Sequence, residues 1–176
     1  MNHSLLSFDK FLSVKAFVFD VDGVLTDGTV QINEAGDQLR TFNIKDGYAL
    51  QLAVKTGYHV AAISGGKSEG VRKRLKMLGV QDIFLGVTNK ENTFKAYCFN
   101  RRLHPDETLF MGDDIPDLGV MNLAGFPVCP NDAVEEIKAI SEYISIKNGG
   151  AGCVRDVIEK VMKLQGTWMM REAMSV

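Results

Sequence analysis

The hydrophobic residues of this chain fall into short continuous runs, which are separated by longer amphipathic stretches. A run that is apolar throughout is typical of a strand buried on both faces of a sheet. Six such runs predict strands within residues 15–21, 59–64, 82–86, 108–112, 126–129 and 143–146. Helical patterns lie between them. Alternating strands and helices predict an α/β, Rossmann-like fold with a mostly parallel sheet flanked by helices.

The clearest helical pattern covers residues 68–79, where Val71, Leu75 and Leu78 share one face and Gly79 follows the helix. The other predicted helices run from Asp46 toward Gly57, over 89–102, after Asp113, around 133–140 and over 154–164. No internal repeat or interdomain linker interrupts this pattern. The chain is therefore predicted to form a single domain over residues 1–176, with a C-terminal tail at about 165–176.

Residues 28–42 alternate instead of repeating with a helical period. Val30 and Ile32 are separated by a polar residue, residues 33–37 are turn-forming, and Leu39 and Phe42 follow. This pattern predicts a β-hairpin after the first strand.

Composition narrows the class of protein. Of the 176 residues, 45% are hydrophobic and the net charge is -2. The chain can thus bury a core, but it offers no basic surface for nucleic acid. Its apolar runs are shorter than the roughly 20 residues of a membrane span, and the N-terminus lacks the features of a signal peptide. The three cysteines form no CxxC pair, which predicts reduced thiols and a cytoplasmic location.

Candidate chemistry lies where the predicted strands end. Asp20 and Asp22 follow the first strand, Ser64 ends the second, Asp113 follows the fourth, and Lys90 begins the helix after the third. Because the carboxyl ends of parallel strands share one edge of a sheet, where ligands bind, we expect these side chains to meet there.

Carboxylates packed this closely repel one another, and burial raises the cost. Asp114 and Asp117 add two more to the loop that begins at Asp113. Oxygen donors without His or Cys suit Mg²⁺, which readily shares its coordination with a phosphate. The pattern therefore predicts a magnesium site and a phosphorylated ligand.

Each of these residues also has a simpler interpretation. Aspartates after strands are common turn formers, Ser64 fits a helix cap or turn, and Lys90 fits a solvated lysine at a helix start. Lys90 nevertheless opposes the helix dipole, which is a mild functional hint. The ordered combination at four strand ends favours the chemical interpretation over chance.

In these residues the chain resembles the haloacid dehalogenase superfamily of phosphatases. "DVDGVLTDG", "ISG", "NK" and "GDDIPD" are similar to its four motifs in order. The hairpin, "FNIKDGYAL", "KSEGVRKRLKMLG" and "GGAGCVRDV" further resemble the capless 3-deoxy-D-manno-octulosonate 8-phosphate phosphatases. The resemblance covers nearly the whole chain.

The resemblance implies a role for each matched residue. Asp20 would be the nucleophile, and Asp22 would protonate the leaving oxygen and then activate water. Asp20, the backbone carbonyl of Asp22, and Asp113 would hold Mg²⁺, while Ser64 and Lys90 would hold the phosphoryl group. The metal site and Lys90 would be supported by two further carboxylates, Asp114 and Asp117.

One departure concerns Gly66, where many relatives carry arginine and relatives acting on nine-carbon substrates can carry glutamate. Gly66 matches neither, which leaves the substrate open. The residues predicted to contact the substrate are Asp46, Lys67, Arg72, Arg74 and Arg155. The cations of residues 67–74 either bind a sugar-acid carboxylate or form a solvated helix face.

The implied function is a Mg²⁺-dependent phosphatase of 3-deoxy-D-manno-octulosonate 8-phosphate in lipopolysaccharide sugar synthesis. A nine-carbon keto-deoxy sugar-acid 9-phosphate of KDN or sialic acid type is the alternative substrate. A non-catalytic domain that binds a phosphorylated ligand is the alternative from another class.

The spacing of the motifs leaves no room for an inserted cap domain, so the site needs another cover. The resemblance implies a homotetramer assembled through the hairpin. The joint at 148–152 would let Arg155 or the tail reach a neighbouring site. An irrelevant, frayed terminus is the alternative for the tail.

Overall fold

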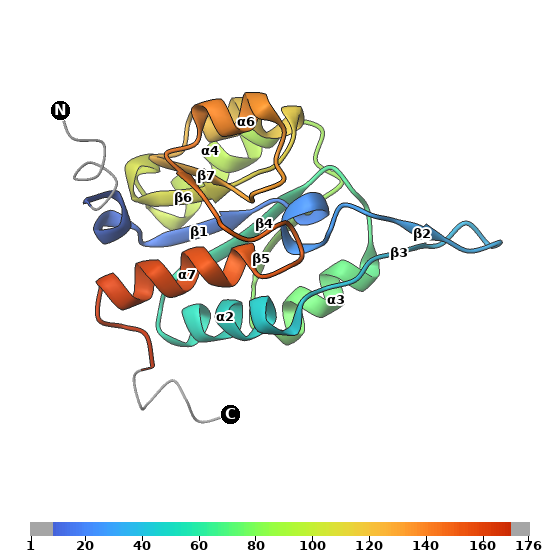
Figure 1. The fold of residues 1–176 in the computed structure, drawn as a ribbon, viewed down its shortest axis with the longest axis horizontal. Helices are drawn as coiled ribbons and strands as arrows, with labels where there is room; N and C mark the ends of the chain where they lie inside the picture. Colours follow the sequence, from blue (N-terminus) through green and yellow to red (C-terminus); the bar gives the residue numbers. More distant parts are fainter. Residues whose placement is uncertain (1–8, 170–176) are drawn as a thin grey trace.

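The computed structural model describes residues 9–169 and arranges them in three layers, with a sheet between two groups of helices (Figure 1). The sheet has the strand order β5-β4-β1-β6-β7-β8, and every neighbouring pair is parallel. Its strands are β1 (Ala16–Phe19), β4 (His59–Ser64), β5 (Asp82–Leu85), β6 (Thr108–Met111), β7 (Phe126–Cys129) and β8 (Tyr143–Ile144).

The two helical layers cover opposite faces of the sheet. α2 (Ile44–Lys55), α3 (Glu69–Met77) and α7 (Cys153–Leu164) pack on one face; α4 (Lys90–Arg101), α5 (Leu118–Met121) and α6 (Glu135–Ile140) pack on the other. In β1, Phe17 and Phe19 join the first core and Val18 joins the second, because successive side chains of a strand point to opposite faces. The continuous apolar run is thus explained by burial on both sides.

The register of the central strands sets the level at which the chain leaves the sheet. Phe19, the last residue of β1, lies opposite both Ala62 of β4 and Met111 of β6. The backbone N–H of Asp20 then donates to the carbonyl of Met111 at 3.0 Å. This register places Asp20 beside the loop that begins at Gly112.

A hairpin of β2 (Gln31–Ile32) and β3 (Gln38–Leu39) projects from the body of the fold between β1 and α2 (Figure 1). Its strands are shorter than the predicted span of 28–42. Ile32 is 70% exposed and Leu39 is 56% exposed. Within the described residues, neither this connection nor the short loop from β4 to α3 holds an inserted cap domain.

Local signals explain where the helices begin. The side chain of Asn43 accepts from the backbone N–H of Lys45 at 2.8 Å, so α2 begins at Ile44 rather than at Asp46 as predicted. The three cysteines are free and buried, which confirms the predicted thiols. Among residues 9–169, the structure contains no helix that is both long and apolar enough to span a membrane.

Candidate active site

The ends of β1, β4 and β6 and the start of α4 surround a cavity of about 330 Å³ at the carboxyl edge of the sheet. It is lined by Asp20, Asp22, Gly23, Gly28, Ser64, Gly65, Gly66, Lys90, Asp113, Asp114, Pro116 and Asp117. All seven residues that the sequence predicted for the catalytic and metal sites are in this group. The parallel topology therefore brings them together as expected.

Asp20 is held from two sides at the end of β1. One carboxylate oxygen accepts from the backbone N–H of Val21 at 2.7 Å, and the other lies 2.9 Å from Nζ of Lys90. Asp20 is 7% exposed. Its rotamer is therefore fixed, as a carboxylate that attacks a bound phosphate requires.

Lys90 links two of the carboxylates. It begins α4, which Asn89 caps, and its Nζ lies 2.7 Å from Asp117 and 2.9 Å from Asp20. Burial alone would lower the pKa of Lys90, but the carboxylates of Asp20 and Asp117 outweigh this and raise it. The lysine is thus charged inside the site, and the simpler interpretation of a solvated helix start does not describe it.

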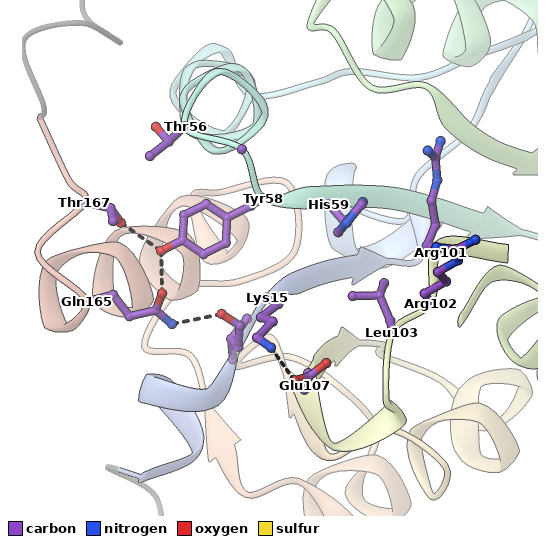
Figure 2. Close-up of a pocket in the computed structure, with 12 residues that line it drawn as sticks. Lys15, Thr56, Tyr58, His59, Arg101, Arg102, Leu103, Glu107, Gln165 and Thr167 are labelled. Atoms are coloured by element: carbon purple, nitrogen blue, oxygen red, sulfur yellow. Dashed lines mark hydrogen bonds and ion pairs between the residues drawn. The ribbon is translucent and has the colours of Figure 1, made fainter. Parts of the chain in front are cut away.

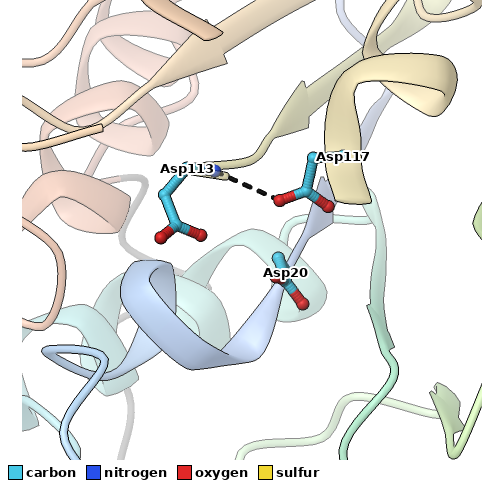
Figure 3. A group of neighbouring side chains, drawn as sticks. All are labelled: Asp20, Asp113 and Asp117. Atoms are coloured by element: carbon cyan, nitrogen blue, oxygen red, sulfur yellow. Dashed lines mark hydrogen bonds between the residues drawn. The ribbon is translucent and has the colours of Figure 1, made fainter. Parts of the chain in front are cut away.

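Asp20, Asp113 and Asp117 form the acidic group shown in Figure 3. Each offers one carboxylate oxygen, and the three oxygens lie within 4.8 Å of one another. Asp117 also accepts from the backbone N–H of Asp113 at 3.2 Å. Both Asp117 oxygens thus have partners, in Lys90 and the backbone of Asp113. The role of Asp117 as a support of the metal site remains a prediction.

The electrostatics of this group favour a cation. Burial and the neighbouring Asp117 raise the pKa of both Asp20 and Asp113 to about 7. One oxygen of Asp113 is buried without a hydrogen-bond partner. An unsatisfied buried carboxylate oxygen is costly, and a divalent cation with oxygen ligands would satisfy it. The donor set therefore fits Mg²⁺.

The backbone after β1 approaches this group closely. Gly23 has φ of +82°, and a Cβ there would lie 2.0 Å from an oxygen of Asp113. Only glycine permits this turn, η1 (Val21–Leu25), to pass against the carboxylate. A role for the Asp22 carbonyl as a metal ligand remains a prediction.

Ser64 and Asp114 line the cavity in different ways. Ser64 is 3% exposed, and its hydroxyl accepts from the backbone N–H of Gly66 at 3.1 Å. It thus shapes the turn, as the simpler interpretation expected, while still bordering the site. The carboxylate of Asp114 accepts from the N–H of Ile115 at 2.8 Å and is exposed.

Asp22 has a partner that the sequence did not reveal. Nε of Arg40 donates to one oxygen of Asp22 at 2.5 Å, and Nη2 lies 3.3 Å from the other. Arg40 follows β3 in the hairpin. A cation in a predicted hairpin was visible in the sequence, but nothing indicated that the hairpin returns toward the catalytic edge.

The predicted substrate-contacting residues do not line the catalytic cavity. Asp46 is 1% exposed, and its carboxylate accepts from the backbone N–H of Arg155 at 2.7 Å. It therefore caps the first turn of α7 in this structure, and a contact between Asp46 and the substrate remains a prediction. Arg155 pairs with Glu159 at 2.9 Å and lies over the rings of Tyr48 and Trp168.

The three cations after β4 point in different directions. Arg72 donates to the carbonyl of Ile83 at 3.1 Å. The guanidinium of Arg74 lies against Gly47 of α2, where a Cβ would be 2.7 Å from Nη2. The stem of Lys67 packs over Gly86. In the single chain, these contacts stabilise the fold, and binding of the substrate by these residues remains a prediction.

Another cavity, of about 450 Å³, lies at the opposite, amino end of the sheet (Figure 2). It is larger than the catalytic cavity. Its lining includes Lys15, His59, Arg101 and Arg102, with Glu107 paired to Lys15. It lacks the convergent carboxylates, so size alone does not identify the site.

Comparisons with known proteins agree with the choice of the cavity at the carboxyl edge of the sheet as the candidate active site. A family model described as haloacid dehalogenase-like hydrolase matches residues 76–158, which include Lys90 and Asp113. The 3-deoxy-D-manno-octulosonate 8-phosphate phosphatase KdsC of Escherichia coli K12 is 32% identical over 157 residues. The match covers 89% of this chain and 84% of that protein.

Solved structures of 3-deoxy-D-manno-octulosonate 8-phosphate phosphatases are also similar to this chain. One is the 3-deoxy-D-manno-octulosonate 8-phosphate phosphatase from Moraxella catarrhalis, in complex with a magnesium ion, a phosphate ion and a KDO molecule. It is 34% identical to this chain, with a TM-score of 0.88, and the match covers 92% of each chain. The one from Yersinia pestis is 26% identical with a TM-score of 0.89, covering 91% of this chain and 86% of that one.

The fold and its acidic edge define a haloacid dehalogenase-like hydrolase. Within this class, the chain belongs to the family of the 3-deoxy-D-manno-octulosonate 8-phosphate phosphatases, and it is a phosphatase.

Proposed function

We propose that this phosphatase hydrolyses 3-deoxy-D-manno-octulosonate 8-phosphate to the free sugar acid and phosphate, with Mg²⁺ as cofactor. The observation that carries the proposal is the fixed arrangement of Asp20, Lys90, Asp113 and Asp117 at one edge of the sheet. The relative from Moraxella catarrhalis, bound to magnesium, phosphate and KDO, supports the choice of metal and substrate.

Asp20 attacks phosphorus in the first step and forms an aspartyl-phosphate, while the sugar oxygen leaves. Lys90 lies 2.9 Å from the attacking carboxylate and offsets negative charge on the phosphoryl oxygens. Ser64, at the end of β4, offers its hydroxyl to the same group. Bound Mg²⁺ supplies positive charge at the phosphoryl oxygens and would be held by Asp20, Asp113 and the Asp22 carbonyl.

Asp22 transfers the protons. Asp20 and Asp22 both line the catalytic cavity, so both can face one bound phosphate. Asp22 protonates the leaving sugar oxygen in the first step. In the second step it takes a proton from the water that attacks the aspartyl-phosphate, which releases phosphate and restores Asp20.

Gly66 leaves the choice between two substrates open. It carries neither the arginine of many relatives nor the glutamate of relatives that act on nine-carbon substrates. A nine-carbon keto-deoxy sugar-acid 9-phosphate is therefore the alternative. The intact catalytic group and the family membership argue against the non-catalytic interpretation.

We further propose that the enzyme works as a homotetramer assembled through the hairpin. Val30, Ile32 and Leu39 are 38%, 70% and 56% exposed in the single chain. Short apolar strands with free edges favour pairing with further copies. A neighbouring subunit would then cover a site that has no cap. The predicted contribution of Arg155 and the tail belongs to this assembly; residues 170–176 lie outside the described residues.

The proposed setting is the cytoplasm, where the product would enter lipopolysaccharide sugar synthesis. Three free, buried cysteines are consistent with a reducing compartment.

The test is phosphate release from the eight-carbon 8-phosphate and a nine-carbon 9-phosphate, each with Mg²⁺ and with EDTA. We expect kcat/KM for the eight-carbon substrate to be at least about 10-fold higher. EDTA should stop release, and added Mg²⁺ should restore it. An equal or reversed preference between the two substrates would favour the alternative substrate. Phosphate release at an unchanged rate in the presence of EDTA would contradict the metal site.

A further inference from the structure

Arg40 follows β3 in the hairpin, yet its side chain is buried against the loop after β1. The side chain of Arg40 is 6% exposed, whereas that of Asp22 is 35% exposed. Nε of Arg40 donates to Oδ1 of Asp22 at 2.5 Å, and Nη2 lies 3.3 Å from Oδ2. The same Nη2 donates to Oε1 of Gln38 in β3 at 3.3 Å. The arginine therefore ties the side chain of Asp22 to the hairpin.

The surroundings of Arg40 keep it in this position. The hollow that Arg40 and Asp22 share with Val71 and Leu85 is too small for a water molecule. Because water does not separate the two charges there, their attraction is screened little. Arg40 does not line the catalytic cavity. It is thus a fixed partner of Asp22, and it can act on a bound substrate only through that carboxylate.

The two oxygens of Asp22 have different surroundings. Oδ1 takes the short contact with Nε, whereas the 3.3 Å contact of Oδ2 exceeds the usual hydrogen-bond length. A Cβ at Gly66 would lie 3.1 Å from Oδ2 and 3.4 Å from the hydroxyl of Ser64. Gly66 and Ser64 both line the catalytic cavity. Glycine at position 66 therefore leaves Oδ2 open on the cavity side, while Arg40 holds Oδ1 from behind.

We propose that Arg40 is a positioning residue for proton transfer, which acts through Asp22 and directs Oδ2 toward the ester oxygen that leaves. This role rests on the proposed function, in which Asp22 protonates that oxygen. The proton passes from Oδ2 to the leaving oxygen as its bond to phosphorus breaks and the bond between Asp20 and phosphorus forms; Arg40 keeps its own protons. Proton transfer requires the two oxygens to lie within hydrogen-bond reach, which a freely rotating carboxyl group satisfies only part of the time. The hairpin thus contributes to catalysis through Arg40.

Phenyl phosphate and p-nitrophenyl phosphate test this role. The two esters have similar shapes, but nitrophenolate leaves with little protonation and phenolate needs more. The measurement is kcat/KM, because it includes the step in which the leaving oxygen departs. In Arg40→Met, kcat/KM for phenyl phosphate should fall by about 10-fold, a part of the roughly 10²–10⁴-fold that general acid–base help is worth. The value for p-nitrophenyl phosphate should stay within about threefold of the wild type. Arg40→Lys should recover part of the loss because it keeps the positive charge.

Combining Arg40→Met with Asp22→Asn gives a sharper test. If Arg40 acts through Asp22, the double variant should hydrolyse phenyl phosphate within about threefold of Asp22→Asn alone. Losses that multiply would overturn the proposal, and so would equal losses of both esters in Arg40→Met. Arg102→Met, a change at an exposed arginine at the other end of the sheet, is the matched control and should behave as the wild type on both esters.

Two further variants keep the result interpretable. If the methionine variant does not fold, Arg40→Gln replaces it, and a wild-type ratio between the two esters in that variant would overturn the proposal. Asp22→Asn alone tests the proposed function: if it slows both esters equally, proton donation by Asp22 fails and the role of Arg40 fails with it. If Asp22→Asn slows phenyl phosphate more but Arg40→Met does not, only the role of Arg40 is wrong. Neither ester is a sugar acid, so the identity of the sugar does not affect the outcome.

Discussion

The catalytic edge and the residues predicted to recognise the sugar differ in how they are held. The side chains of Asp20, Lys90 and Asp117 are at most 10% exposed, and Lys90 contacts both aspartates within 2.9 Å. Arg155, by contrast, pairs with Glu159 outside the catalytic cavity. One chain therefore assembles the predicted catalytic group, while we propose that recognition of the whole sugar acid requires contacts from a neighbouring subunit.

The difference follows from the elements that carry the residues. Strand ends in a parallel sheet are fixed by register, so Asp20 and the Asp113 loop cannot move apart without breaking the ladder between β1 and β6. Arginines on helix surfaces have long, rotatable side chains. In this structure they contact partners within the same chain, and we propose that the substrate or another subunit replaces these partners.

The largest effect is expected for Asp20→Asn. An amide is a poor nucleophile, so turnover of every substrate should fall by on the order of 10⁴–10⁶-fold, the range seen when a nucleophile is removed. Steady-state phosphate release measures this. Asp106→Asn, the same change at an exposed position near the amino end of the sheet, should be neutral. Near wild-type turnover in the Asp20 variant would remove the basis of the mechanism.

Asp22→Asn should have a smaller and substrate-dependent effect. General acid–base help is worth roughly 10²–10⁴-fold, so turnover of the sugar-acid phosphate should fall in that range. p-Nitrophenyl phosphate should lose less, because its leaving group needs little protonation. The ratio of the two rates is the measurement. Equal losses would contradict proton donation by Asp22 to the leaving sugar oxygen.

Arg74→Ala tests the recognition side of the comparison. Its guanidinium lies against Gly47 in the single chain, and we predict that it binds the substrate carboxylate in the working enzyme. KM for the sugar-acid phosphate should rise about 10-fold, the value of one charged hydrogen bond. KM for p-nitrophenyl phosphate should change little. Lys73→Ala, an exposed neighbour on α3, is the control; identical effects on both substrates would indicate a structural role.

The smallest expected effect is the dependence on pH of the thermal stabilisation by Mg²⁺. The pKa of Asp20 and Asp113 is raised from 3.8 to about 7 by burial and by Asp117. The folded chain thus binds more protons than the unfolded chain between these values. This stabilisation is complete below about pH 3.8 and is lost as pH rises through 7. Mg²⁺ should replace the lost protons, so it should raise Tm by a few degrees more at pH 8 than at pH 5.5. An equal shift at both pH values, measured by differential scanning fluorimetry, would contradict the proposed site.

Much of the fold and catalytic edge could be predicted, because strong local signals and a simple topology agree. Continuous apolar runs predict strands buried on both faces, and parallel strands place Asp20, Ser64 and Asp113 at one edge. Lys90 was recognisable because it opposes the helix dipole. The structure confirms that these side chains meet.

Contacts that depend on tertiary packing were not predictable. Asp46 is far in sequence from the first turn of α7, which it caps, and no local pattern links the two. The contact between Arg40 and Asp22 depends on where the hairpin lies relative to the sheet. Strand periodicity gives the existence of a hairpin but not its direction.

The most direct test of the account separates catalysis from recognition in one variant. Ile32→Lys places a charge on the exposed hairpin strand and should dissociate the proposed tetramer, as measured by light scattering. Glu34→Lys in the exposed hairpin turn is the control. The account predicts that the dissociated enzyme hydrolyses p-nitrophenyl phosphate within about threefold of the wild type but loses at least about 10-fold in kcat/KM for the sugar-acid phosphate. Full activity of a monomer on the sugar-acid phosphate, or equal losses on both substrates, would contradict it.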